Sequence, residues 1–339
     1  MTFPNFSIYA TAPFDQPASY ADQWNVSYQR ELGSSWTASV NYLESRGRHL
    51  PTSNETNPAV FIPGTCGATP CSTTANSNQR RTLFLENPTL GSAYADLIEI
   101  VNRGRSSYKG LLLSMQRRAG NGLSVQGNYT LSKCDSDRLE MSAGGTLGAT
   151  PFTRPGNRDA DYGSCGGADR RHVVNLSTVY QTPQKAGVVG ALANDWQLSG
   201  ILNVQSGNHF AVVTGVDNAL NKVAQTPTQR PNQILDDPYL KQGYRWLNPA
   251  AFRAPDPGTY GTLPINTIVA PGRFNIDAML TRSFRTTGTQ QLQFRAEAFN
   301  LLNRTQLGVP ELRMNQATFG LITTAFDPRI VQLALKYSF

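Results

Sequence analysis

Apolar and polar side chains alternate with a period of two in segments of about ten residues along most of this chain. The closing segment is the clearest, because Val331, Leu333, Leu335, Tyr337 and Phe339 fall on one face and small or polar residues fall on the other. Side chains of a β-strand point alternately to opposite faces, so each segment predicts a strand with one apolar face. The chain is therefore expected to be all-β.

Four hairpins and the closing strand account for these segments and give about nine strands. The predicted hairpins pair residues 24–32 with 36–42, 108–118 with 123–133, 171–181 with 196–205, and 274–284 with 290–300.

The connections between these strands alternate in length. Turns within the hairpins are the shorter ones, whereas long stretches rich in Gly, Pro, Asn, Thr and Ser separate the hairpins at 45–107, 134–170, 206–273 and 301–328. Loops above about 15 residues are uncommon in compact soluble domains. Because successive strands reverse direction, all the long loops fall at one end of the sheet. This asymmetry is typical of an antiparallel transmembrane β-barrel with short periplasmic turns and long extracellular loops.

Composition agrees with a barrel and excludes a helical membrane protein. Mean hydropathy is −0.36, and no run of apolar residues reaches the roughly 18 that a spanning helix needs. Low hydropathy is compatible with a barrel, because its strands need one apolar face toward lipid and can be polar toward the lumen. A soluble sandwich or propeller is the alternative that the alternation leaves open.

Charge indicates no nucleic-acid partner. The net charge of +7 comes from 30 basic and 23 acidic residues that are dispersed along the chain, with nothing longer than Arg-Arg pairs, whereas nucleic-acid binding requires clustered basic residues. The first ten residues, MTFPNFSIYA, contain neither a basic region nor an apolar core, so no signal peptide is expected there.

Several motifs, in this order, resemble TonB-dependent receptors of the Oar-like type. They are Asp169 to His172, Asp195 to Gly200, Gln205 to Gly207, Leu292 to Asn303, and Asp327 to Gln332. The resemblance extends over essentially the whole chain. It implies a 22-stranded barrel, a plug domain that fills it, and an N-terminal segment that the TonB complex engages.

From this resemblance, residues 1–339 are expected to be a partial TonB-dependent receptor-like β-barrel domain, about nine strands from its C-terminal part. Plug domain, TonB box and signal peptide are expected to be absent. The implied partners are outer-membrane lipid, the TonB complex through the missing N-terminal region, and the machinery that assembles outer-membrane proteins.

All four cysteines lie in the predicted long loops. An exterior location is oxidising, so disulfides Cys66–Cys71 and Cys134–Cys165 are candidates. Free cysteines and zinc ligation are the alternatives. His49, His172 and His209 are scattered without ligand spacing, so we expect neither a metal site nor a cofactor.

Three charged residues of the last predicted hairpin, Asp277, Arg295 and Glu297, would point toward the lumen, with Asp277 near Glu297 and Arg295 diagonal to it. Paired carboxylates can serve acid–base catalysis. A lumen salt-bridge ladder or a contact surface for a plug is the interpretation we favour, so the chain is not expected to be an enzyme.

The closing run from Val331 to Phe339 is similar to the assembly signal of outer-membrane proteins, since a free edge strand suits recognition by strand addition. The sequence thus predicts a C-terminal barrel segment, in the cell outer membrane, of a TonB-dependent transporter or receptor for a bulky solute. The alternative is a secreted soluble β-domain that binds glycans. The sequence identifies no particular substrate.

Overall fold

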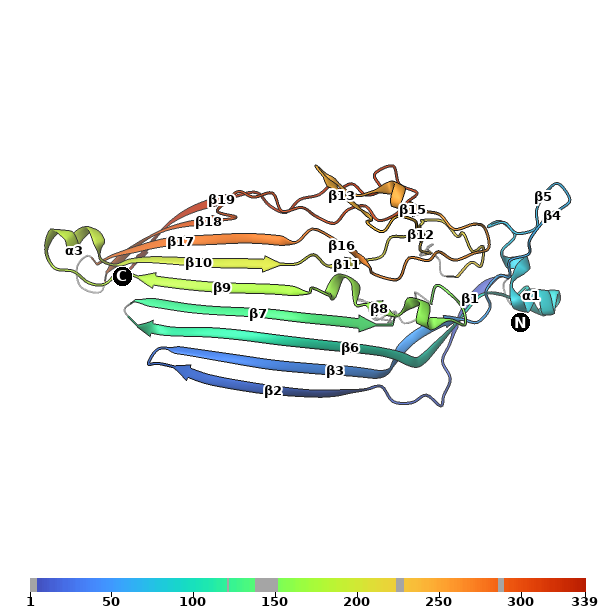
Figure 1. Cartoon of the computed structure of the whole chain (residues 1–339), viewed down its shortest axis with the longest axis horizontal. Helices are drawn as coiled ribbons and strands as arrows, with labels where there is room; N and C mark the ends of the chain where they lie inside the picture. The colour runs from blue at the N-terminus through green and yellow to red at the C-terminus, as the bar shows by residue number, and fades with distance from the viewer. Residues whose placement is uncertain (1–4, 121, 138–151, 224–228, 286–289) are drawn as a thin grey trace.

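The computed structural model describes residues 5–120, 122–137, 152–223, 229–285 and 290–339. Long strands lie side by side in one sheet (Figure 1). In chain order its main strands are β2 (Tyr20–Leu32), β3 (Trp36–Glu55), β6 (Tyr94–Gly120), β7 (Leu123–Ser136), β9 (His172–Gln181), β10 (Trp196–Gln205), β17 (Arg273–Arg285), β18 (Gln291–Phe299) and β19 (Ile330–Ser338).

The sheet has a simple up-and-down order. Its main path is β19-β18-β17-β10-β9-β7-β6-β3-β2, and every neighbouring pair on this path is antiparallel. Two short strands complete the eleven of this sheet: β1 (Ser7–Thr11) pairs in parallel with β6, and β8 (Gly163–Ser164) pairs with β7. The predicted all-β, antiparallel fold is confirmed, and the nine predicted strands correspond to the nine of the main path.

The remaining elements are short and lie in the connections. Small two-stranded sheets are formed by β4 (Thr65–Cys66) with β5 (Thr69–Pro70), β11 (His209–Phe210) with β16 (Ile268–Val269), β12 (Asn232–Gln233) with β15 (Phe252–Arg253), and β13 (Tyr239–Gln242) with β14 (Arg245–Leu247). The helices are η1 (Asn78–Arg80), α1 (Thr82–Glu86), α2 (Pro88–Gly91), η2 (Arg158–Asp161), η3 (Gly166–Ala168), α3 (Gly187–Ala193) and η4 (Pro249–Ala251). In the part of the chain that the structure describes, none of the helices has the length and apolar character to cross a membrane.

The two ends of the sheet differ, as the loop lengths predict. One end of the sheet, which we call the turn end, holds the short connection from β2 to β3 and the connection from β9 to β10 that contains α3. The long irregular segments gather at the other end, the loop end (Figure 1). At the turn end Gly33 adopts a φ of +66°, a conformation that glycine takes without steric cost, so the chain reverses between β2 and β3.

One predicted loop is partly wrong. Residues 45–107 were expected to be a loop, but β3 continues to Glu55 and β6 begins at Tyr94, with pairing that extends to Glu55 opposite Ile98. The extension lacks strict apolar alternation because hydrogen bonds to polar groups cover it: Gln16, for example, accepts from the Asn102 backbone N–H at 2.6 Å and donates to the Ile100 carbonyl at 2.9 Å. Outside lipid, strand pairing therefore needs no apolar face.

Register divides the sheet into an apolar and a polar face. One row of directly paired residues crosses seven strands on the polar face, and the next row crosses the same strands on the apolar face. The polar row is Gln29, Ser39, Ser114, Asn128, Asn175, Asn203 and Asn275, and the apolar row is Tyr28, Val40, Leu113, Tyr129, Val174, Val204 and Phe274. Such a division suits a wall between lipid and an aqueous lumen.

The buried apolar cluster of the protein lies in the long connections at the loop end. Its residues are Val212, Leu247, Ala251, Phe252, Leu263, Ile268 and Phe319. By contrast, side chains on the apolar face of the sheet remain exposed, as for Leu333 at 68% and Leu335 at 70%. The sheet therefore offers its apolar face to an apolar surrounding instead of packing it against a second layer.

A charge on the apolar face tests this division. Replacing Leu202, near the middle of β10, by Arg should destabilise the lipid-embedded protein by about 2–4 kcal/mol, because an Arg near the bilayer midplane loses its hydration. Replacing the adjacent Asn203 of the polar row by Arg is the matched control and should cost less than about 1 kcal/mol. Urea unfolding in lipid vesicles, followed by tryptophan fluorescence, measures both. Equal losses for the two variants would contradict the assignment of the faces.

Candidate functional site

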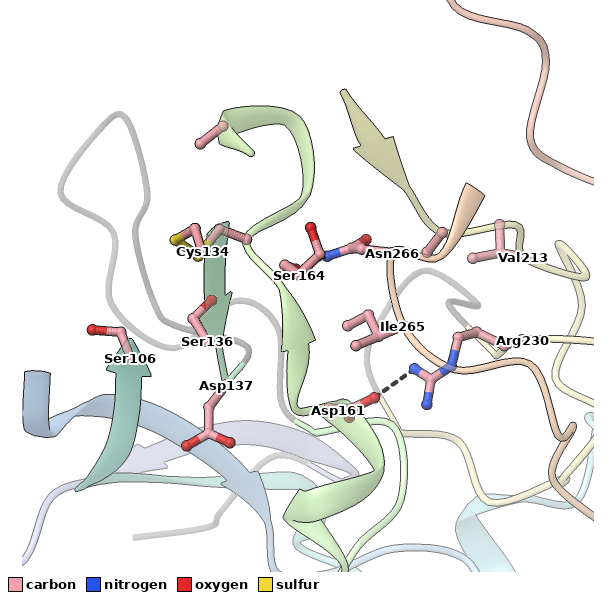
Figure 2. Close-up of a pocket in the computed structure, with 13 residues that line it drawn as sticks. Ser106, Cys134, Ser136, Asp137, Asp161, Ser164, Val213, Arg230, Ile265 and Asn266 are labelled. Carbon is pink, nitrogen blue, oxygen red and sulfur yellow. Dashed lines mark hydrogen bonds and ion pairs between the residues drawn. A yellow bond between two sulfur atoms is a disulfide. The ribbon is translucent and has the colours of Figure 1, made fainter. Parts of the chain in front are cut away.

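A cavity with a volume of about 610 Å³ lies at the loop end of β6 and β7 (Figure 2). Its polar lining comes from both strands and from the following loops. The lining includes Ser106, Ser136, Asp137, Asp161, Ser164, Arg230 and Asn266, together with Cys134 and Cys165. We call this hollow the first cavity.

Two disulfides join the cysteines in the pairs that the sequence suggested. Cys134 is bonded to Cys165 beside the first cavity, and Cys66 is bonded to Cys71 in an exposed hairpin of the loop end. Cys134–Cys165 is supported by a backbone hydrogen bond from Cys165 N to the Cys134 carbonyl at 3.1 Å. This bridge fastens the segment around η3 to the end of β7, which fixes one wall of the cavity.

A buried ion pair forms a second wall. Arg230 donates to Asp161 at 2.5 Å, to the Ala160 carbonyl at 2.6 Å and to the Leu263 carbonyl at 2.9 Å, and both side chains of the pair are almost completely buried. Asp161 also accepts from the Thr153 backbone N–H at 2.6 Å and from its hydroxyl. With its partners satisfied in this way, the pair holds three loops in one arrangement.

Asp137 is a polar group of the first cavity with spare hydrogen-bonding capacity. Its Oδ2 accepts from the Arg105 backbone N–H at 2.8 Å and lies 3.5 Å from Arg158 Nη2, whereas Oδ1 has no hydrogen-bond partner among the described residues. Burial raises the pKa of this carboxyl, although the neighbouring N–H and guanidinium groups oppose the rise. The wall of the cavity therefore contains a buried carboxyl with one oxygen that no described donor reaches, and serine hydroxyls line the same space.

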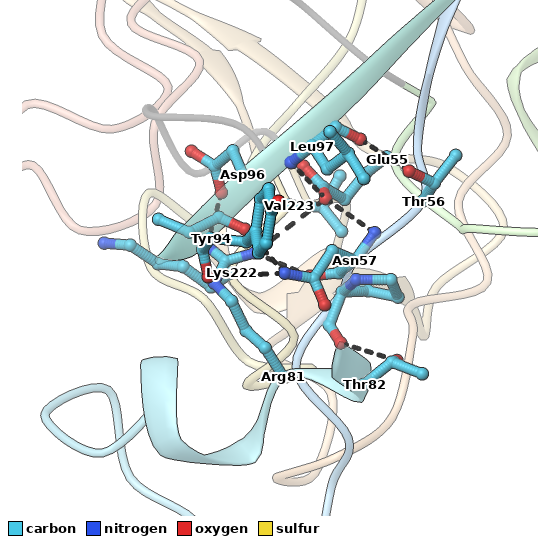
Figure 3. Close-up of polar contacts among 12 residues, drawn as sticks. Glu55, Thr56, Asn57, Arg81, Thr82, Tyr94, Asp96, Leu97, Lys222 and Val223 are labelled. Carbon is cyan, nitrogen blue, oxygen red and sulfur yellow. Dashed lines mark hydrogen bonds and ion pairs between the residues drawn. The ribbon is translucent and has the colours of Figure 1, made fainter. Parts of the chain in front are cut away.

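The loop end contains another buried cluster around Arg81, outside the first cavity (Figure 3). Arg81 is ion-paired with Asp96, donates to the Asn57 carbonyl at 2.7 Å, and lies 3.8 Å from Glu55. Glu55 accepts from the backbone N–H groups of Asn57 and Leu97 at 2.9 and 3.0 Å. Two carboxylates thus face one guanidinium, and burial raises the pKa of Glu55, which the charge of Asp96 reinforces.

The charges predicted on the last hairpin are only partly brought together. Arg295 lies 3.3 Å from Glu297, but register places Met279, and not Asp277, opposite Glu297. Asp277 instead accepts from Asn275 Nδ2 and from the Asn300 backbone N–H, each at 2.8 Å. Asp277 therefore lies two residues along β17 from the position opposite Glu297, because the pairing of β17 with β18 ends at Ala278 opposite Ala298.

The predicted closing strand is β19, which pairs on one side with β18. Val331, Leu333, Leu335 and Tyr337 are more than half exposed on its apolar face, and Phe339 is 93% exposed. No group of three or more potential metal ligands is present among the described residues. Apart from Cys134 and Cys165, the residues of the first cavity were missed from the sequence; the signal available was Asp137, which lies four residues after the predicted strand 123–133 at the predicted exterior end.

A family model described as "Outer membrane beta barrel domain" matches residues 1–332. The chain therefore belongs to the outer membrane beta barrel domain family, and its location is the cell outer membrane. No curated protein matches the sequence.

Several solved structures are similar to the chain in shape. The outer membrane transporter YddB from Escherichia coli has 11% identity and a TM-score of 0.49, and 97% of this chain aligns with 34% of that one. BauA, the ferric preacinetobactin receptor from Acinetobacter baumannii, has 14% identity and a TM-score of 0.43, with coverages of 94% and 29%. The pyoverdine outer membrane receptor FpvA from Pseudomonas aeruginosa has 12% identity and a TM-score of 0.43, with coverages of 95% and 30%. The chain thus spans about a third of the length of each.

The Arg81 cluster leads to a pH prediction. Because the pKa of Glu55 is higher in the folded than in the unfolded state, the free energy of unfolding falls as pH rises from the ordinary carboxyl value of 4.5 through the raised value. Gln at position 55 does not titrate, so Glu55→Gln should gain stability relative to the unmutated protein as pH rises through this window.

Urea midpoints at several pH values between about 4 and 8 measure the difference. Glu86→Gln, at an exposed glutamate that ends α1, is the control. A stability difference for Glu55→Gln that stays constant with pH, or that falls, would overturn the assignment of a raised pKa to Glu55.

Proposed function

We propose that this chain is the C-terminal barrel segment of a TonB-dependent outer-membrane transporter or receptor that takes up a bulky solute. The observation that carries the proposal is the asymmetry of the sheet. Long connections with their own apolar cluster and disulfides lie at one end, and shorter connections lie at the other (Figure 1). The sequence motifs that resemble TonB-dependent receptors of the Oar-like type support the finer assignment.

The direction of the edge strands supports a partial barrel domain. Nine strands alternate in direction along the main path, so β2 and β19 both run from the loop end to the turn end. A direct pair between them, within one copy or between two copies inserted the same way, would be parallel. Bacterial barrels are antiparallel with an even number of strands, so closure requires an odd number of further strands.

We therefore propose that residues 1–339 are a partial domain, completed by polypeptide outside this range. A barrel of about 22 strands, as the resemblance implies, leaves about 13 strands to be supplied, and this number has the required parity. The plug domain and the region that engages TonB belong to the same missing part in this proposal.

Solute contact is proposed at the loop end, with the first cavity as one contact site. Its acceptor and hydroxyl groups suit binding through hydrogen bonds, and no nucleophile–base pair among its described residues suggests catalysis, so we propose a non-enzymatic role. The apolar face is proposed to contact outer-membrane lipid. The exposed run from Val331 to Phe339 on β19 is proposed to be read by the assembly machinery.

Accessibility on intact cells tests the orientation. An epitope inserted after Gly67, in the disulfide hairpin of the loop end, should bind antibody on intact cells, because this end is proposed to be extracellular. The same epitope inserted after Gln184, in the connection from β9 to β10, should bind only after the outer membrane is permeabilised. The opposite pattern, or exposure of both epitopes on intact cells, would contradict the proposal.

A pull-down tests the dependence on TonB. The purified periplasmic domain of TonB should bind the product of the whole gene and should not bind residues 1–339 alone, because engagement is proposed to lie in the missing region. If the product of the whole gene fails to bind, the assignment to TonB-dependent proteins is wrong. If residues 1–339 bind alone, the location of the TonB contact is wrong.

A further inference from the structure

A second cavity, of about 300 Å³, lies where the loop ends of β9, β10 and β17 meet residues 307–326. It shares no lining residue with the first cavity. The polar side chains that line it are Arg170, Asn208, Arg273 and Thr324, and Phe326 lies beside them. No acidic residue is among its lining residues.

Two cations in the second cavity lack an acidic partner. Within the described residues, neither Arg170 nor Arg273 lies within 4.0 Å of a carboxylate. Both side chains are partly buried. Burial lowers the pKa of Arg170, and the positive charge of Arg273 lowers it further. Holding two like charges near each other in a partly buried site costs free energy, which a bound anion would offset.

The nearest carboxylates in the sequence are engaged elsewhere or exposed. Asp169 accepts from the Ser164 hydroxyl at 2.9 Å and from the Cys134 backbone N–H at 3.3 Å, and it lies 3.9 Å from His209 Nε2. Asp277 accepts from Asn275 and Asn300. Asp327 is exposed and forms no ion pair with another described residue. The protein therefore supplies no counter-charge of its own from these positions.

The floor of the second cavity is held firmly. Arg170 forms a β-bridge with Asn208, and Asn208 donates to the Gly167 carbonyl at 2.9 Å. The backbone at Gly207 lies so close to Ala270 that a Cβ on Gly207 would be 1.7 Å from the Ala270 carbonyl oxygen, so only glycine fits at position 207. This geometry fixes the backbone from which Arg170 extends.

Arg273 is positioned by an aromatic ring. Its guanidinium lies over Phe326 at 3.9 Å from the ring centroid. Stacking occupies the face of the guanidinium and leaves its in-plane N–H groups to bind an oxyanion at two points. The guanidinium of Arg273 is thus a second group of donors that is oriented before any ligand binds.

We propose that the second cavity is an oxyanion-binding site in which Arg170 and Arg273 together bind a phosphate or carboxylate group. Asn208 and Thr324 line the same space and can contribute hydrogen bonds. The anion belongs either to a solute that reaches the loop end or to a phosphorylated lipid headgroup of the surrounding leaflet. This site does not depend on engagement of TonB.

Calorimetric titration of the whole chain in detergent, at low ionic strength, tests the site with inorganic phosphate and with citrate. One saturable site is expected. Arg170→Gln and Arg273→Gln should each weaken binding at least about tenfold, the loss expected when a charge-assisted hydrogen bond is removed. Arg171→Gln changes the adjacent arginine, which does not line the cavity, and should alter affinity less than about twofold. Non-saturable binding, or equal losses in all three variants, would overturn the proposal.

A variant that keeps both arginines separates binding from folding. Thr324→Glu places a carboxylate at an exposed position of the cavity lining, where it should act as an internal counter-ion and abolish phosphate binding. Thr324→Gln, of nearly the same shape, should retain it. Unchanged heat-dependent gel mobility shows that both variants fold. Phosphate binding by Thr324→Glu equal to that of Thr324→Gln would contradict the proposal.

Competition identifies where the anion comes from. Displacement of phosphate by micelles doped with a monophosphorylated lipid, but not with its dephosphorylated form, indicates the headgroup. Displacement by citrate without an effect of the lipid indicates a soluble anion. Displacement by neither would contradict an oxyanion site.

Discussion

Every backbone N–H and C=O group that lies in lipid must find its partner within the protein, and most of this structure follows from that requirement. Nine antiparallel strands satisfy one another through eight consecutive pairings. Because paired residues point to the same side, the register carries one chemical character across many strands, as in the row from Gln29 to Asn275. The same requirement makes the outer edges of β2 and β19 the two places where the sheet is incomplete.

The loop end follows different rules, because water can satisfy its backbone groups. The apolar cluster that includes Leu247 and Ile268 packs there as in an ordinary soluble domain. Two disulfides and buried ion pairs lie at the same end of the protein. The ion pair between Asp161 and Arg230 is costly to desolvate, but with its hydrogen bonds satisfied it favours one loop arrangement over others. Shape at this end is thus specified by polar contacts, and shape in the sheet by backbone pairing.

The periodicity of the sequence was sufficient to predict the fold, because contact with lipid requires an apolar side chain at every second position of a strand. The apolar face of β10 or β19 can therefore be identified by taking alternate residues along the chain. It failed where lipid is absent. The extensions of β3 beyond Ser45 and of β6 before Ser107 are strands without apolar alternation, since polar contacts such as those of Gln16 cover them.

The site was less predictable than the fold for a related reason. Asp277 was expected to face the region of Glu297 from an assumed turn, and the observed register places Met279 opposite Glu297 instead. Asp137, Asp161 and Arg230 come together from segments about 25 to 95 residues apart in the chain, and no local pattern encodes such contacts. The cysteines are the exception, because an oxidising exterior location favours disulfides between the four cysteines of the predicted loops.

Polar and charged groups that are left without a partner are the most informative feature of the loop end, because stability does not explain them. Around the first cavity each guanidinium is paired with a carboxylate, as Arg230 is with Asp161. The group that is left without a hydrogen bond is one acceptor oxygen of Asp137. In the second cavity the groups without a partner are cations, because Arg170 and Arg273 face no described acidic residue. Folding alone would favour neutral side chains in the second cavity, since an unpaired charge loses hydration without compensation. Groups retained at such a cost are best explained by a ligand of opposite character, and the two cavities therefore differ in the chemistry they select.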